Sequence, residues 1–113
     1  MSRIRIAVAL GAAVLVAAVG AGSALAAGTL KAADGPGFTI TLSAKTVKAG
    51  TYKIVVSDKG SIHNFHLMGP GVNKTTSISG TGTSTWNVTL KKGTYKYQCD
   101  VHASSMHGTL KVT

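Results

Sequence analysis

The sequence of 113 residues has a single cysteine, which excludes an internal disulfide and any Cys-x-x-Cys motif for zinc, haem or dithiol chemistry. It has no glutamate, and three aspartates stand against 12 lysines and arginines, so the net charge is +9. That charge favours acidic proteins, anionic surfaces or nucleic acid as partners. Aromatic residues make up only 5%, so a core must consist mainly of aliphatic side chains.

The composition that remains favours short β-strands joined by tight turns. Glycine is abundant, with 14 residues, and threonine is frequent, whereas proline occurs only twice. Threonine suits strands and glycine suits turns. A chain of this length forms one small domain at most.

The N-terminal segment is typical of a secretory signal peptide. Arg3 and Arg5 precede an uncharged run over residues 6–27, and small residues at Ala24 and Ala26 fit an A-x-A cleavage site. The alternative is an uncleaved membrane anchor, because the run is just long enough to span a bilayer. A lipid anchor is excluded, since the single cysteine is far from the cleavage site.

We expect cleavage after Ala26, with a signal peptide over residues 1–26 and an exported domain over residues 27–113. The domain would lie in the periplasm, outside the cell or at the cell surface, with no membrane span. Loss of the two arginines lowers the net charge from +9 to +7. A domain this small often needs a covalent or metal staple, and with no disulfide available we expect a bound metal.

The hydrophobic pattern of the exported domain has a period of two, which predicts half-buried strands. Tyr52, Ile54 and Val56, for example, alternate with Lys53 and Ser57. Glycine-containing turns separate about seven such segments, which indicates an all-β protein, an antiparallel sandwich or barrel. The predicted strands are 29–32, 38–42, 52–57, 62–68, 86–90, 94–99 and 109–113. The long segment 68–83 lacks alternation and is interpreted as a surface connection.

The same alternation assigns directions to the residues with metal chemistry. Cys99 ends an inward-facing row that includes Tyr95 and Tyr97, which we interpret as core aromatics. His63 shares a face with large apolar neighbours, whereas His66 lies on the opposite face and is predicted to be exposed.

A thiol, an imidazole and a thioether follow one another in Cys99, His102 and Met106, and His63 lies 36 residues before the cysteine. Two histidines and one cysteine in a plane, with a weak axial methionine, form the ligand set of blue-copper electron-transfer sites. Thiolate and thioether suit Cu(I), and imidazole suits both oxidation states. His107, next to the methionine, is predicted to be exposed beside the metal edge.

The pattern Tyr97-x-Cys99-x2-His102-x3-Met106, with His63-Asn64 upstream, resembles the cupredoxins, the plastocyanin-like and pseudoazurin-like small blue copper proteins. The resemblance covers essentially the whole domain in strand order and implies a Greek-key β-sandwich. It implies that one copper ion, cycling between Cu(II) and Cu(I), is held by His63, Cys99, His102 and Met106. It also implies that Asn64 ties the first ligand strand to the cysteine loop. Plastocyanin-like loops usually have four residues between the second histidine and the methionine, and this loop has three.

Two other chemistries are less consistent with the pattern. Structural zinc takes four strong ligands, and methionine is not among them. With no glutamate and no convincing base among Asp34, Asp58 and Asp100, hydrolytic zinc chemistry is disfavoured; we interpret Asp100 as a solvated loop residue. Nucleic-acid binding is disfavoured because the lysines are spread over strands and turns without interleaved aromatics.

The sequence therefore predicts an exported type 1 copper protein, a monomer and not an enzyme, that transfers single electrons between redox partner proteins. Its positive charge suggests partners with acidic docking surfaces. The alternative is a copper-delivery protein on the same fold. A metal-free adhesion sandwich fits the ligand pattern least.

Overall fold

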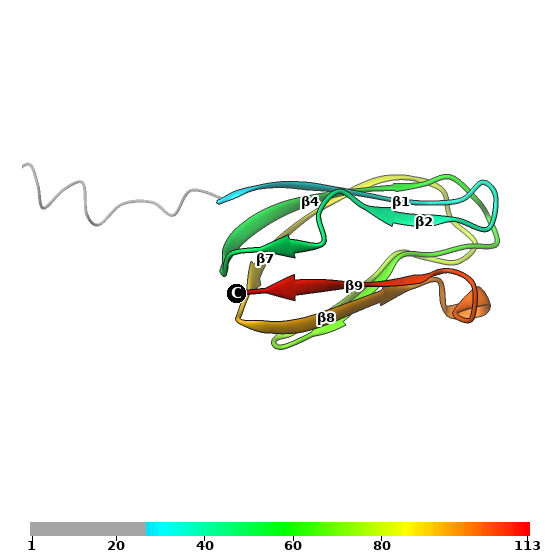
Figure 1. Cartoon of the computed structure of the whole chain (residues 1–113). Helices are drawn as coiled ribbons and strands as arrows, with labels where there is room; N and C mark the ends of the chain where they lie inside the picture. Colours follow the sequence, from blue (N-terminus) through cyan, green and yellow to red (C-terminus); the bar gives the residue numbers. More distant parts are fainter. Residues whose placement is uncertain (1–26) are drawn as a thin grey trace, which may run out of the picture.

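The computed structural model describes residues 27–113, so the expected signal peptide lies outside the described residues. This part of the chain folds into two β-sheets with one short 3₁₀ helix (Figure 1). The strands are β1 (Gly28–Asp34), β2 (Ile40–Leu42), β3 (Thr46–Val47), β4 (Gly50–Asp58), β5 (His66–Gly69), β6 (Val72–Thr75), β7 (Gly82–Leu90), β8 (Gly93–Gln98) and β9 (His107–Val112), and the helix is η1 (Asp100–His102). Among these residues, no helix is long and apolar enough to cross a membrane.

The predicted all-β sandwich is confirmed, with four strands in one sheet and five in the other. The strand orders are β2-β1-β4-β7 and β3-β9-β8-β5-β6. The sheets are mixed and not purely antiparallel, because β1 pairs with β4, and β3 with β9, in parallel. Half-buried parallel and antiparallel strands share the same alternation of side chains, so the sequence pattern could not distinguish the two pairings.

Three segments differ from the predicted strands. Phe38 is 61% exposed in the loop before β2, so its assignment to a buried strand face was wrong. The strand predicted over residues 62–68 begins only at His66. The connection 68–83 contains β6, which pairs with β5 and follows the turn at Gly71.

The core lies between the sheets and is largely aliphatic, as the composition predicted. It is completed by a few aromatic rings; Phe65 stacks on Tyr97 with ring centroids 5.4 Å apart. The side chains of Ile54, Leu67 and Leu110 have no exposed surface.

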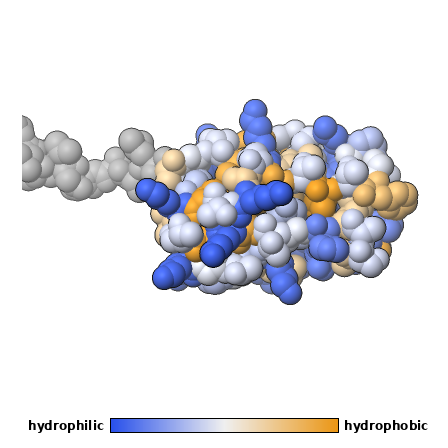
Figure 2. Space-filling model, viewed as in Figure 1, coloured by the Kyte–Doolittle hydropathy of each residue, from blue (hydrophilic) through white to orange (hydrophobic). Residues whose placement is uncertain are grey.

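The two ends of the sandwich differ. The C-terminus and the start of β1 lie at one end, and η1 with several loops lies at the other (Figure 1). Figure 2 shows apolar surface at this loop end and also between the hydrophilic side chains that project from the body of the sandwich. The residues with metal chemistry are found at the loop end.

Candidate metal centre

His63 sits in the loop between β4 and β5 and is completely buried. Its backbone N–H donates to the carbonyl of Gly60 at 3.2 Å, and its ring lies against two glycines. A Cβ atom added at Gly60 would lie 2.7 Å from the Cδ2 of His63. One added at Gly35, where φ is 70°, would lie 2.9 Å from the same atom. Such contacts are too close for a side chain, so both glycines are needed for this ring position.

The other candidate ligands come from the loop between β8 and β9, which is closed by its own backbone. The N–H of Cys99 donates to the carbonyl of Met106 at 3.0 Å, and the N–H of Met106 donates to the carbonyl of His102 at 2.8 Å. The N–H of His102 donates to the carbonyl of Cys99 at 3.1 Å, which forms the turn of η1. The Cys99 and Met106 side chains are fully buried and that of His102 is partly exposed.

The fold brings three donor atoms from these two loops into one triangle. The Nδ1 atoms of His63 and His102 lie 3.1 Å apart, and the Sγ of Cys99 lies 3.7 Å from the first and 3.6 Å from the second. A triangle with these sides has its centre about 2.0 Å from each corner, close to the length of a bond from a metal ion to a histidine nitrogen.

This donor set fits a copper ion. Two neutral imidazoles that direct their Nδ1 lone pairs at one point repel each other unless a cation or a proton lies between them. A thiolate and two imidazoles, with a thioether on the same loop, match the preferences of copper. Among residues 27–113, no fourth strong ligand joins the triangle, which disfavours structural zinc.

An exposed aromatic ring packs on both histidines of the triangle, and two exposed apolar residues flank these histidines in the sequence. The Phe38 ring meets the ring of His102 edge-on, with centroids 4.9 Å apart, and meets that of His63 in the same way at 5.4 Å. Ile62 and Val101, each next to a candidate ligand, are 55% and 56% exposed. Sequence reasoning missed this role of Phe38; the Gly-Pro-Gly turn before it was the signal that could have placed it in a loop.

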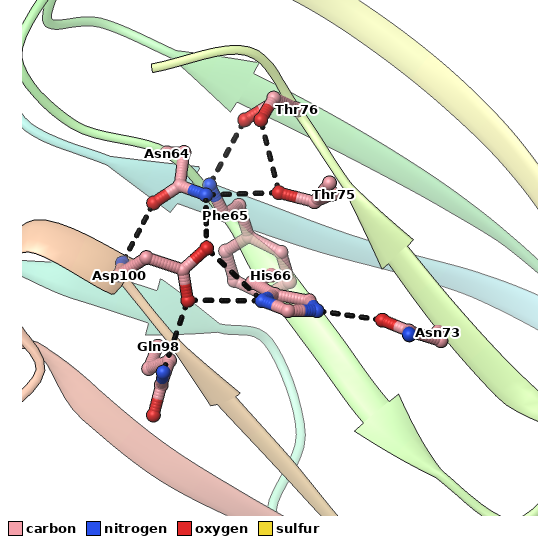
Figure 3. Close-up of polar contacts among 8 residues, drawn as sticks. All are labelled: Asn64, Phe65, His66, Asn73, Thr75, Thr76, Gln98 and Asp100. Atoms are coloured by element: carbon pink, nitrogen blue, oxygen red, sulfur yellow. Dashed lines mark hydrogen bonds and ion pairs between the residues drawn. The ribbon is translucent and has the colours of Figure 1, made fainter.

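Asn64 connects the loop of His63 to the loop that follows Cys99. It is buried; its Oδ1 accepts from the N–H of Asp100 at 2.8 Å, and its Nδ2 donates to the Asp100 Oδ2 at 2.9 Å and to the Thr75 Oγ1 at 2.8 Å (Figure 3). One amide side chain thus joins the residue after Cys99 to the end of β6.

Asp100 is exposed and His66 is partly exposed, and the two side chains are paired with each other, which the sequence did not indicate. The His66 Nδ1 donates to Asp100 at 2.9 Å, and its Nε2 donates to the Asn73 Oδ1 at 2.6 Å (Figure 3). Burial lowers the pKa of His66, but the hydrogen bonds to Asn73 and Asp100 and the charge of Asp100 outweigh it and raise the pKa above its ordinary value. Strand alternation places His66 away from the core, but it does not reveal a partner from another loop.

The pKa of Asp100 moves in the opposite direction. Burial alone would raise it, but hydrogen bonds from Gln98, His66 and Asn64, together with the positive charge of His66, lower it. Both carboxylate oxygens are occupied by these donors, so Asp100 is turned away from the triangle of donor atoms. His107, exposed as predicted, donates from Nδ1 to the carbonyl of Ala103 at 2.8 Å.

A second group of acids, which sequence reasoning did not single out as a pair, lies at the same end of the sandwich. Asp34 and Asp58 end the parallel strands β1 and β4, face each other in register and are both buried. Burial, a hydrogen bond with Asp58 and the charge of Asp58 together raise the pKa of Asp34 to about 7.

Comparison with known structures identifies the fold. The chain is similar to reduced rusticyanin, with a TM-score of 0.59 and 23% identity over 75% of this chain and 78% of that one. It is also similar to rusticyanin from Thiobacillus ferrooxidans, with a TM-score of 0.58 and 22% identity over 75% and 76% of the two chains. A further similar structure is that of rusticyanin, named there as a copper protein. Comparison with protein-family models gives no match, and comparison with curated proteins gives none either.

The described part of the chain therefore has the fold of rusticyanin, a cupredoxin. At this level of identity the likeness establishes the arrangement of strands. The chemistry of the site is carried by the three donor atoms and their surroundings.

Proposed function

We propose that this protein is a type 1 copper protein that carries single electrons between redox partners. The observation that supports it most directly is the triangle formed by the His63 Nδ1, His102 Nδ1 and Cys99 Sγ, whose sides fit one metal ion. When bound, copper would supply the one-electron Cu(II)/Cu(I) couple.

Each residue of the site has a distinct part in this proposal. Cys99, as a thiolate, and the Nδ1 atoms of His63 and His102 would hold the ion, and the Met106 thioether would be a fourth, weaker donor. The hydrogen bonds that close the 99–106 loop keep these donors in place in both oxidation states. Little rearrangement on electron transfer favours a shuttle.

The surface around His102 supports exchange of electrons with another protein. His102 is partly exposed, and Phe38, Ile62 and Val101 form an apolar surface beside it. A docked partner would exclude water there and approach the imidazole edge. The lysines around the sandwich would favour a partner with acidic side chains.

Copper delivery is the alternative on this fold, and burial distinguishes the two roles. His63, Cys99 and Met106 have no exposed surface, and the ligands come from two separate loops. Release of copper to an acceptor would need these loops to separate, so the site favours retention. We further propose that residues 27–113 are the exported domain, acting in the periplasm or outside the cell after removal of residues 1–26.

The test is to add one equivalent of Cu(II) to the purified metal-free protein and to record its visible spectrum and voltammogram. We expect intense thiolate-to-copper absorption and reversible one-electron reduction, with copper retained in the presence of a competing chelator. Cys99→Ser should remove the absorption. A colourless, redox-silent complex in the unmodified protein would contradict the proposal, and rapid loss of copper to the chelator would favour delivery.

A further inference from the structure

One ionic contact beside the candidate metal centre has no part in the donor triangle. His66 begins β5, and Asp100 follows Cys99 on the other loop. The His66 Nδ1 contacts both Asp100 carboxylate oxygens, at 2.9 and 3.1 Å. The side chain of His66 is 19% exposed and that of Asp100 is 36% exposed, so the pair is only partly screened by water.

The surroundings of His66 favour its charged form. Its two ring nitrogens face acceptors on opposite sides, Asp100 on one and the Asn73 Oδ1 on the other, so both nitrogens donate only when the ring is an imidazolium. The Gln98 Nε2 also donates to Asp100 at 3.0 Å. Charge-assisted hydrogen bonds of this kind are stronger than neutral ones.

Asn64 and His66 hold Asp100 from two directions. Asn64 bonds to the backbone N–H and to one carboxylate oxygen of Asp100, and His66 bonds to the carboxylate from the neighbouring strand. Asn73 on β6 in turn fixes the His66 ring (Figure 3). The first residue of η1 is therefore attached to β5 and β6 by side chains, next to the end of the β5–β8 ladder.

We propose that His66 and Asp100 form a clamp that holds the start of the cysteine loop in its metal-binding position before metal enters. His66 is a positioning residue, because it acts on Cys99 only through Asp100. The inference rests on the proposed copper site for its purpose, but the clamp itself belongs to the metal-free chain. It makes the donor triangle a preformed site, which limits rearrangement on binding and on electron transfer.

The clamp can be measured without metal, by amide hydrogen exchange followed by NMR at about pH 6, where His66 is charged. We expect His66→Gln to accelerate exchange of the residue-100 amide about tenfold, as expected for loss of one charge-assisted hydrogen bond, and Asp100→Asn to accelerate it at least as much, because the carboxylate also accepts from Gln98 and Asn64. The double variant should exchange no faster than the faster single variant. Exchange at Ile54, in the core of β4, should stay unchanged, which shows that the sandwich remains folded.

Two further variants make this result specific. Asn73→Ala, on the exposed edge strand β6, removes only the second acceptor of His66 and should give a smaller acceleration in the same direction. Lys96→Gln removes a positive charge from the exposed face of β8 and should have no effect. Unchanged exchange in the His66 and Asp100 variants would overturn the clamp. So would a double variant whose acceleration equals the product of the two single accelerations, because the two residues would then act independently.

The reduction potential of the copper-loaded protein is a second readout, and simple loosening of the cysteine loop would not shift it in opposite directions in the two variants. His66→Gln leaves the Asp100 carboxylate without its positive partner beside Cys99, so the reduction potential should fall. Asp100→Asn removes the negative charge, so the potential should rise. Shifts of the same sign would overturn the inference. If the unmodified protein does not bind copper, the proposed function fails, whereas the exchange rates still decide whether the clamp exists.

Discussion

At the scale of single residues, burial and contact separate the histidines. His63 is enclosed by glycines and directs its Nδ1 at Cys99 and His102, whereas His66 is occupied by Asp100 and Asn73. Tertiary contacts make this distinction and not strand alternation, because His63 lies in the loop before β5, where three consecutive side chains are buried. Substitution at the two positions should therefore have very different consequences.

We expect His63→Ala to abolish the coloured copper site, because it removes one of three donors in the plane. His66→Ala should keep the absorption nearly intact, since His66 acts only through Asp100. The measurement is the visible spectrum of each variant with one equivalent of Cu(II). Equal loss of absorption in both would contradict the assignment of His63 as a ligand.

Replacement of Met106 by Gln should lower the reduction potential and keep the thiolate-to-copper absorption. The amide oxygen is a harder donor than the thioether and stabilises Cu(II) relative to Cu(I), while the three donors in the plane remain. We expect a shift of at least about 59 mV, a tenfold change in the equilibrium constant of a one-electron couple. An unchanged spectrum and potential in Met106→Gln would mean that Met106 is not the axial ligand.

The buried acid Asp34 should make stability depend on pH. Its pKa is about 7 in the folded chain and near 4 when unfolded, so between these values only the folded state holds the proton. Stability should therefore fall as the pH rises from about 4 to about 7. Asp34→Asn should reduce this fall, leaving the part that the raised pKa of His66 contributes, and should make the protein more stable than the unmodified chain at about pH 8.

Urea unfolding at about pH 5 and about pH 8 measures this effect. Asp100→Asn is the contrasting variant, because the pKa of Asp100 is lowered by its partners. Its carboxylate contributes stability above the ordinary pKa of an aspartate, and that contribution is lost as the pH falls through the lowered value. A pH dependence in Asp34→Asn as large as that of the unmodified protein would show that another group carries it.

At the scale of secondary-structure elements, close packing between strands positions the loops. Tyr95 on β8 is fully buried, and its hydroxyl donates to the carbonyl of Pro70 at 2.6 Å and accepts from the N–H of Lys91 at 2.9 Å. The ring is therefore held at its far end and cannot swing away. It lies directly against the backbone of Gly69, at the end of β5.

We expect Gly69→Ala to destabilise the protein by about 1–3 kcal/mol, the usual cost of overpacking a core. A Cβ atom at Gly69 would lie 2.3 Å from the Cδ2 of Tyr95, so the ring or the strand must move. Gly37→Ala is the matched control, because no atom lies within 4 Å of its Cβ position. Thermal unfolding compares the two; equal midpoints would show that β5 and β8 separate easily.

At the scale of the whole molecule, the surface combines many positive charges with exposed apolar residues at the loop end. Residues 27–113 carry ten lysines and three aspartates, and the apolar surface of Phe38, Ile62 and Val101 lies at the loop end. Two of the three aspartates are buried and the third is paired with His66. The charged groups on the exterior are thus mostly positive, which would attract an acidic partner over long range.

Electron transfer with an acidic partner protein should therefore slow steeply as salt is added. Attraction between separated surface charges is screened over about 10 Å at about 0.1 M salt, whereas apolar contact at the loop end is much less sensitive. Stopped-flow rates across that range of ionic strength measure the effect, with a neutral small-molecule reductant as the control. A flat rate with the acidic partner would show that the lysines serve solubility and not docking.

The sequence by itself determined the features that depend on local order. Alternating side chains predicted an all-β sandwich, and the types and spacing of His63, Cys99, His102 and Met106 predicted a metal centre at the end of a strand. Only the tertiary structure decided the parallel pairing of β1 with β4, the apolar surface at Phe38 and the contact between His66 and Asp100. These features join segments far apart in the chain, and their partners are chosen by packing across the sandwich, which no local pattern of residues encodes.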